Sequence, residues 1–249
     1  MRRVLAAAAI ILSAGTAFGE SVGTIQMQYS SWYGNGTGTT IHWLDDASHL
    51  HSDKTLVGLG RFNKTAGTGV GALFANGQLS VFCKDLYHTL YQPKATYDVV
   101  PLSAAPNGKP ISPDRIALFQ ELFGRHYTGL FSGSESDKKN KAESFGLCVW
   151  ELMNETGGTL DVKTGPGFWT GYGNTTVTST ANGWLASLDG QGPKWNVYAL
   201  VAPGGHQDFM IARVPEPATL VNLLAGGALG LGWLVYRRRR SREPARSRQ

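Results

Sequence analysis

Cys83, Asp85 and His88 lie close together in the sequence and carry the side chains best suited to chemistry. A thiol, an imidazole and a carboxylate are the groups of a cysteine hydrolase, provided that the base lies within hydrogen-bond reach of the sulfur. On an extended strand, however, Cys83 and Asp85 point to one face and His88 to the other. The spacing therefore disfavours a catalytic cysteine, and we predict that the protein is not an enzyme.

A second group of candidate ligands is His49-Leu50-His51, with Asp53 two positions later. On a strand these side chains would share one face and offer two imidazoles and a carboxylate to a zinc or copper ion. A solvated loop explains the same residues without a metal. We predict no metal site and no cofactor.

The first 19 residues have the pattern of a secretory signal peptide. Two arginines precede an apolar run over residues 4–12, and small residues at Ala17 and Gly19 precede a cut before Glu20. We therefore expect export to an oxidising compartment. In such a compartment the two cysteines, Cys83 and Cys148, could form a single disulfide.

The C-terminal stretch carries three features in order. Pro215, Glu216 and Pro217 come first, residues 218–236 follow without a charge, and a basic cluster ends the apolar run, namely Arg237, Arg238, Arg239 and Arg240. About 20 apolar residues cross a hydrocarbon core of about 30 Å, and arginines stay on the cytoplasmic side. We predict one transmembrane helix with the preceding domain outside.

This order resembles the PEP-CTERM sorting signal of Gram-negative bacteria. In that family an exosortase, a membrane cysteine peptidase, recognises the signal and is thought to cut near the Pro-Glu-Pro motif. The resemblance implies three partners: an exosortase-type peptidase, the membrane and extracellular polysaccharide. It also implies an inner-membrane precursor that moves to the cell surface or the extracellular matrix.

The same resemblance divides the chain into four parts. These are a signal peptide, an exported domain, a sorting anchor and a basic cytoplasmic tail, at residues 1–19, 20–212, 213–241 and 242–249. The tail is a departure, because the family usually ends soon after the arginines.

The exported region is acidic although the whole chain is basic. The chain has a net charge of +5, whereas residues 20–217 carry 14 Lys and Arg against 17 Asp and Glu, a net charge of −3. No basic stripe on the folded part is implied, so we expect no nucleic-acid partner. The many Gly, Ser, Thr, Asn and aromatic residues are typical of a secreted β-rich protein.

Strand patterns come first along the exported region. Residues 21–51 lack a helical period and have a loop-like middle. Strands are expected at residues 56–62, 68–74, 78–86 and 97–100, with Asn76-Gly77 as a hairpin signal between the second and third.

Helix signals follow. Ser112 and Pro113 predict the start of a helix that ends at Gly124, and Asn140 with Glu143 predicts a capping box for a second helix over residues 141–155. In the second helix one apolar face carries Phe145, Cys148, Val149 and Leu152. A short third helix is expected near residues 181–188, before closing strands at 195–201 and 209–211. The predicted fold is α+β, a strand-built sandwich or barrel with two or three inserted helices.

Four short motifs then give a second resemblance, to the thioester-domain-like ectodomains of PEP-CTERM proteins. The motifs are Gly60-Arg61-Phe62, Phe82-Cys83-Lys84-Asp85-Leu86, Phe145-Gly146-Leu147-Cys148-Val149-Trp150-Glu151 and His206-Gln207-Asp208-Phe209. In thioester domains of surface adhesins, a cysteine is joined to a glutamine of a Q-x-A-[IV]-W helix. The resulting bond is an electrophile that couples the protein to a nucleophile on its target.

Carried over position by position, the reactive cysteine falls on Cys83 and the tryptophan on Trp150, but the glutamine falls on Gly146. Glycine has no carboxamide, so the resemblance implies the fold without its thioester. Cys148 stands at the family's alanine position, where a Cys83–Cys148 disulfide would join strand to helix. Such a bond contributes about 2–4 kcal/mol by closing a loop of roughly 65 residues. Two buried free thiols are the alternative.

The expected protein is therefore an exported, non-enzymatic surface or matrix protein with a structural or adhesive role. One alternative is a covalent adhesin with an internal thioester at Cys83, which requires a different register at Gly146. Another is a membrane-tethered periplasmic hydrolase.

Overall fold

The computed structural model describes residues 20–34, 38–45, 47–105 and 111–214. The predicted signal peptide, the sorting motif Pro215, Glu216 and Pro217, the predicted span and its arginines lie outside these residues. Within the described ranges, the helices are too short or too polar to cross a membrane. The chain divides into two compact units, Met1–Arg213 and Val214–Gln249, and the fold below belongs to the first.

Six antiparallel strands form a closed barrel in the order β1-β4-β5-β9-β8-β6. Their bounds are Gly23–Tyr33 for β1, Leu59–Gly69 for β4, Gly77–Cys83 for β5, Ala95–Pro101 for β6, Asn196–Val201 for β8 and Phe209–Arg213 for β9. A smaller sheet has the order β3-β2-β7, with β2 at Thr39–Leu44, β3 at Leu50–Thr55 and β7 at Phe168–Thr170. The α+β class is thus confirmed in its barrel form.

Aromatic side chains fill the barrel. Phe62, Tyr97 and Phe209 are fully buried, and Phe62 meets Phe209 edge to face with ring centroids 5.0 Å apart. On β1, the buried Ile25 and Met27 alternate with more exposed neighbours, as expected for a strand with one face on a core. Long-range packing therefore makes β1 a strand, although residues 21–51 show no helical period and no strand was predicted there.

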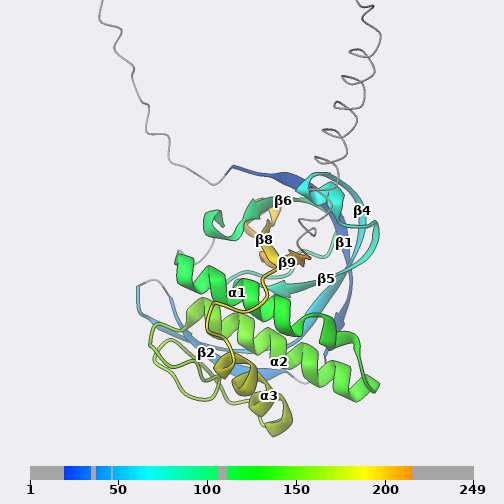
Figure 1. The fold of residues 1–249 in the computed structure, drawn as a ribbon. Coiled ribbons are helices and arrows are strands. Elements are labelled where there is room, and N and C mark those ends of the chain that lie inside the picture. The colour runs from blue at the N-terminus through cyan, green and yellow to red at the C-terminus, as the bar shows by residue number, and fades with distance from the viewer. Residues whose placement is uncertain (1–19, 35–37, 46, 106–110, 215–249) are drawn as a thin grey trace, which may run out of the picture. The chain divides into compact units, whose positions relative to one another are not determined.

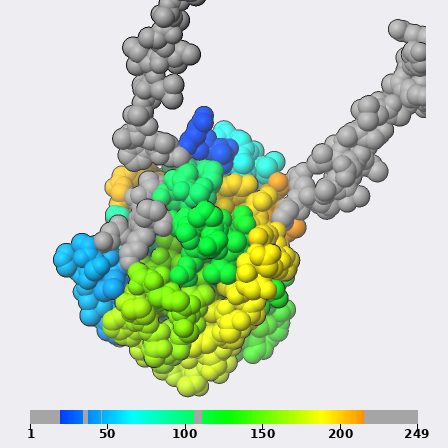
Figure 2. Space-filling model, turned by 60° about the vertical axis from the view of Figure 1, so that its left-hand side comes forward, coloured from blue at the N-terminus to red at the C-terminus, as the bar shows by residue number. Residues whose placement is uncertain are grey.

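Two α-helices lie against one side of the barrel, α1 at Pro113–His126 and α2 at Glu135–Asn154, and a third, α3 at Thr175–Ala186, packs on α2, as Figure 1 shows. The predicted start of α1 is confirmed, because the Ser112 side chain accepts a hydrogen bond from the Arg115 amide. In the space-filling view, the helical region lies beside the blue β2–β3 segment on one flank (Figure 2).

The predicted start of α2 is wrong. Its capping box is formed by Ser134 and Asp137, so the polar stretch expected to be a linker forms the first turns of the helix. Those turns are largely exposed, whereas every residue from Ala142 to Asn154 is buried. The reason is that α2 packs between strands β4 and β5 on one side and α3 and β7 on the other.

Two strand predictions also need correction. Residues Val70–Leu73 form a 3-10 helix, and β4 extends to Gly69. β5 therefore pairs with β4, from Gly60 opposite Val81 to Lys64 opposite Gly77. The connection between these strands is longer than the tight turn that was predicted at Asn76-Gly77. The strands expected at 97–100, 195–201 and 209–211 are confirmed as β6, β8 and β9.

Candidate functional site

A cavity of about 450 Å³ lies where the two sheets, α2 and the loop after β5 meet. It is lined by Tyr29, Trp32, Ile41, Trp43, Asp53, Lys54, Thr55, Leu56, Cys83, Leu86, His88, Thr89, Leu90, Gln92, Trp150 and Gln207. Aromatic and aliphatic walls therefore surround a small set of reactive and polar groups, as in most ligand sites.

Cys83 is the last residue of β5 and pairs with Phe209 of β9. Its carbonyl accepts a 3.1 Å hydrogen bond from the buried indole of Trp150, which anchors the strand end to α2. Burial, followed by the negative charge of Asp85, raises the pKa of the Cys83 thiol. The thiol is therefore neutral at physiological pH, unlike the thiolate of a cysteine hydrolase.

Asp85 organises a tight turn directly after the strand. Its Oδ1 accepts hydrogen bonds from the amides of Tyr87 and His88, both at 3.0 Å, and lies 3.1 Å from Nδ1 of His88. The prediction that His88 points away from Cys83 is wrong, because the strand ends at Cys83 and the turn brings His88 back to the same cavity.

Gln207 is the site residue that the sequence interpretation missed. Pairing between the chain segments continues past β5, since the Lys84 amide donates to the Asp208 carbonyl at 2.9 Å and the Asp208 amide donates to Oδ2 of Asp85 at 2.8 Å. The Gln207 side-chain amide donates to the Asp85 carbonyl at 3.0 Å, and its backbone amide donates to Thr89. A carboxamide therefore lines the cavity that holds Cys83.

Gly146 is not equivalent to this glutamine. A Cβ atom at Gly146 would lie 3.0 Å from the Gly58 carbonyl oxygen, so α2 approaches the backbone of the β3–β4 connection there. Gly146 does not line the Cys83 cavity. Trp150, in contrast, lies beside Cys83 as its position in the motif implied.

Both cysteines are free and buried, so the expected Cys83–Cys148 disulfide is not formed in the structure. Residues two positions apart on an α-helix, such as Cys148 and Trp150, point about 200° apart around the helix axis. Because Trp150 faces Cys83, Cys148 faces the other way, and its thiol donates to the Ala181 carbonyl of α3 at 3.4 Å. Burial, then the nearby Glu151, raises the pKa of the Cys148 thiol, which is typical of an inert core cysteine.

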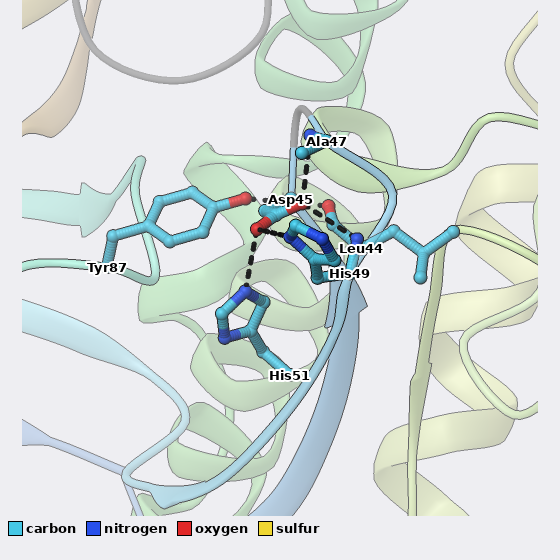
Figure 3. Close-up of polar contacts among 6 residues, drawn as sticks. All are labelled: Leu44, Asp45, Ala47, His49, His51 and Tyr87. Atoms are coloured by element: carbon cyan, nitrogen blue, oxygen red, sulfur yellow. Dashed lines mark hydrogen bonds and ion pairs between the residues drawn. The ribbon is translucent and has the colours of Figure 1, made fainter.

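The histidines at the start of β3, His49 and His51, contact the carboxylate of Asp45 and not that of Asp53. Nδ1 of His49 and Nε2 of His51 lie 3.2 and 3.0 Å from Oδ2 of Asp45, as Figure 3 shows. The hydrogen bond from His51, then that from the His49 amide, lowers the pKa of Asp45. Among the described residues, no cluster of His, Cys, Asp or Glu is arranged to hold a metal ion.

A more open and polar groove of about 740 Å³ lies at the start of β2. It is lined by Gly38, Thr39, Thr40, Lys54, Ser136, Asn140, Gly171, Tyr172, Gly173 and Asn174. Lys54 borders both hollows, but the larger one contains neither a thiol nor an imidazole. The chemistry of the domain therefore concentrates in the smaller cavity.

Comparison with known proteins finds no matching family model, no matching curated protein and no matching solved structure.

Proposed function

We propose that the chain is an exported surface adhesin whose domain captures an amine covalently through a thioester between Cys83 and Gln207. The observation that carries the proposal is that both side chains line one cavity at the paired ends of β5 and β9. The target is a primary amine on a surface or matrix polymer. The protein is consumed by the coupling and is not an enzyme.

Formation of the bond balances without a further reactant. The Cys83 sulfur attacks Cδ of Gln207, the carbon–nitrogen bond of the carboxamide breaks, and the thiol proton leaves with the nitrogen as ammonia. Capture follows when an amine attacks the same carbon, which forms an amide on residue 207 and returns the Cys83 thiol. The site suits a neutral thioester, because burial penalises a thiolate but not an uncharged acyl sulfur.

Export and sorting are proposed from the ends of the chain. The pattern over residues 1–19 supports secretion. The Pro215-Glu216-Pro217 motif, the uncharged run over 218–236 and the arginines Arg237, Arg238, Arg239 and Arg240 support membrane anchoring and recognition by an exosortase-type peptidase. Proteins and free amino sugars of an extracellular polysaccharide matrix would then supply the neighbouring amines.

Treatment with methylamine tests the capture reaction. We expect the untreated domain, unfolded without reductant, to alkylate at Cys148 alone, and the methylamine-treated domain to alkylate at both cysteines. The treated protein should also carry N-methylglutamine at position 207 in its peptide map. If Cys83 alkylates fully before treatment, the domain is instead a non-covalent surface module with two free thiols.

A further inference from the structure

We infer that His88 is the general base that activates the incoming amine, and that Asp85 positions it. This inference rests on the proposed Cys83–Gln207 thioester. His88, Cys83 and Gln207 line the same cavity, although they come from the loop after β5, the end of β5 and the segment before β9.

The Asp85 carboxylate fixes the proton arrangement of the imidazole. A carboxylate only accepts hydrogen bonds, so Nδ1 of His88, 3.1 Å from Oδ1, is the protonated ring nitrogen. In the neutral ring Nε2 then carries the lone pair that takes a proton. Asp85 is itself held by the amides of Tyr87, His88 and Asp208, and it is almost wholly buried.

The same loop also positions residue 207. The Gln207 side-chain nitrogen donates to the Asp85 carbonyl at 3.0 Å, a contact that holds the carboxamide in the cavity until that nitrogen leaves as ammonia. The Gln207 backbone amide donates to the carbonyl of Thr89, the residue after His88, and keeps this contact after the thioester has formed. The backbone that carries the acyl group and the imidazole are therefore held by one short loop, Asp85 to Thr89. A base held this way is oriented by a third group, as activated nucleophile sites require.

The proposed step is a proton relay that accompanies acyl transfer. The amine nitrogen attacks the acyl carbon of residue 207, and His88 accepts the proton that this nitrogen loses. The carbon–sulfur bond breaks with its electron pair on sulfur, and the imidazolium returns the proton to Cys83. Since the buried Cys83 thiol has a raised pKa, a leaving sulfur benefits strongly from this proton.

Other titratable groups also face the cavity, namely Tyr29, Asp53, Lys54 and Cys83, and the carboxylate of Asp85 contacts His88 from behind the lining. The matched control is a histidine outside the cavity. His206 is adjacent to Gln207 in the sequence, packs against Tyr91 with ring centroids 4.5 Å apart, and does not line the cavity. His206→Asn should change neither the reaction rate nor its pH profile.

The test is the rate of Cys83 thiol release by methylamine across about pH 5 to 8, where imidazole changes its charge. For a fixed concentration of neutral amine, the wild-type rate should rise and level off as an imidazole loses its proton. His88→Asn should slow the reaction about 100-fold and remove this rise of the rate with pH, as loss of a general base does. Added imidazole should restore part of the rate in His88→Ala.

A wild-type rate that stays flat over this range, or a His88→Asn variant that reacts at the wild-type rate, overturns the inference. Failure of the thioester itself is recognised separately. In that case the wild-type domain shows no loss of ammonia in its intact mass, before any methylamine is added.

Discussion

Gln207→Ala should abolish amine capture completely. Without the carboxamide, Cys83 has no acyl group to attack, so the purified variant should retain the full mass of its sequence and alkylate at both cysteines without treatment. The measurement is the incorporation of a biotinylated primary amine, read by blotting and by peptide mapping. The fold should survive, because Gln207 is only partly buried and lies outside β9.

Gln92→Ala is the matched control, since Gln92 is the second glutamine that lines the cavity. Gln92 is exposed, and its segment is not paired with the strand that carries Cys83. Amine incorporation by this variant should equal that of the wild type. If Gln207→Ala still incorporated the amine, or if Gln92→Ala alone lost incorporation, Gln207 would not be the residue that supplies the acyl group.

Glu151→Gln should remove a large pH dependence of stability. Glu151 is fully buried on α2, and burial, partly opposed by the hydrogen bond from the Asp161 amide, raises its pKa to about 8. Between the unfolded pKa of about 4.5 and this value, the folded state holds a proton that the unfolded state has lost. Stability is therefore greatest below the unfolded pKa and falls as the pH rises towards 8.

The size of this effect follows from about 1.4 kcal/mol per pH unit for one proton. From pH 5 to pH 8 the wild-type free energy of unfolding should fall by about 4 kcal/mol relative to that of Glu151→Gln. Denaturant unfolding at both pH values measures it. Glu151→Met is the second variant, because it also lacks the titrating group. Parallel profiles for wild type and both variants would contradict a neutral, buried Glu151.

The parts of the fold that follow from local sequence were predictable. Ser112 and Pro113 set the start of α1 through capping that is encoded within a few residues. The start of α2 was misplaced because two capping boxes compete in one polar stretch, and the Ser134 box lies earlier along the helix. β1 was missed because its identity depends on pairing with β4 and β6.

The candidate site divides in the same way. Periodicity placed Cys148 in the core, but only the packing of α2 between the barrel and α3 shows that it faces away from Cys83. Gln207 depends on pairing between β5 and β9, which are distant in the sequence. The local motif of Cys83, Asp85 and His88 was visible, yet its geometry rests on where β5 ends.

The intact mass of the mature, untreated exported domain tests the central claim most directly, together with alkylation in denaturant without reductant. We predict a mass below that of the reduced sequence by one ammonia, with Cys148 as the single alkylated thiol. A full mass with both cysteines alkylated would contradict the thioester and leave a non-covalent surface module. A mass lower by two hydrogens with no alkylation would instead show a disulfide, and would mean that α2 turns to bring Cys148 to Cys83.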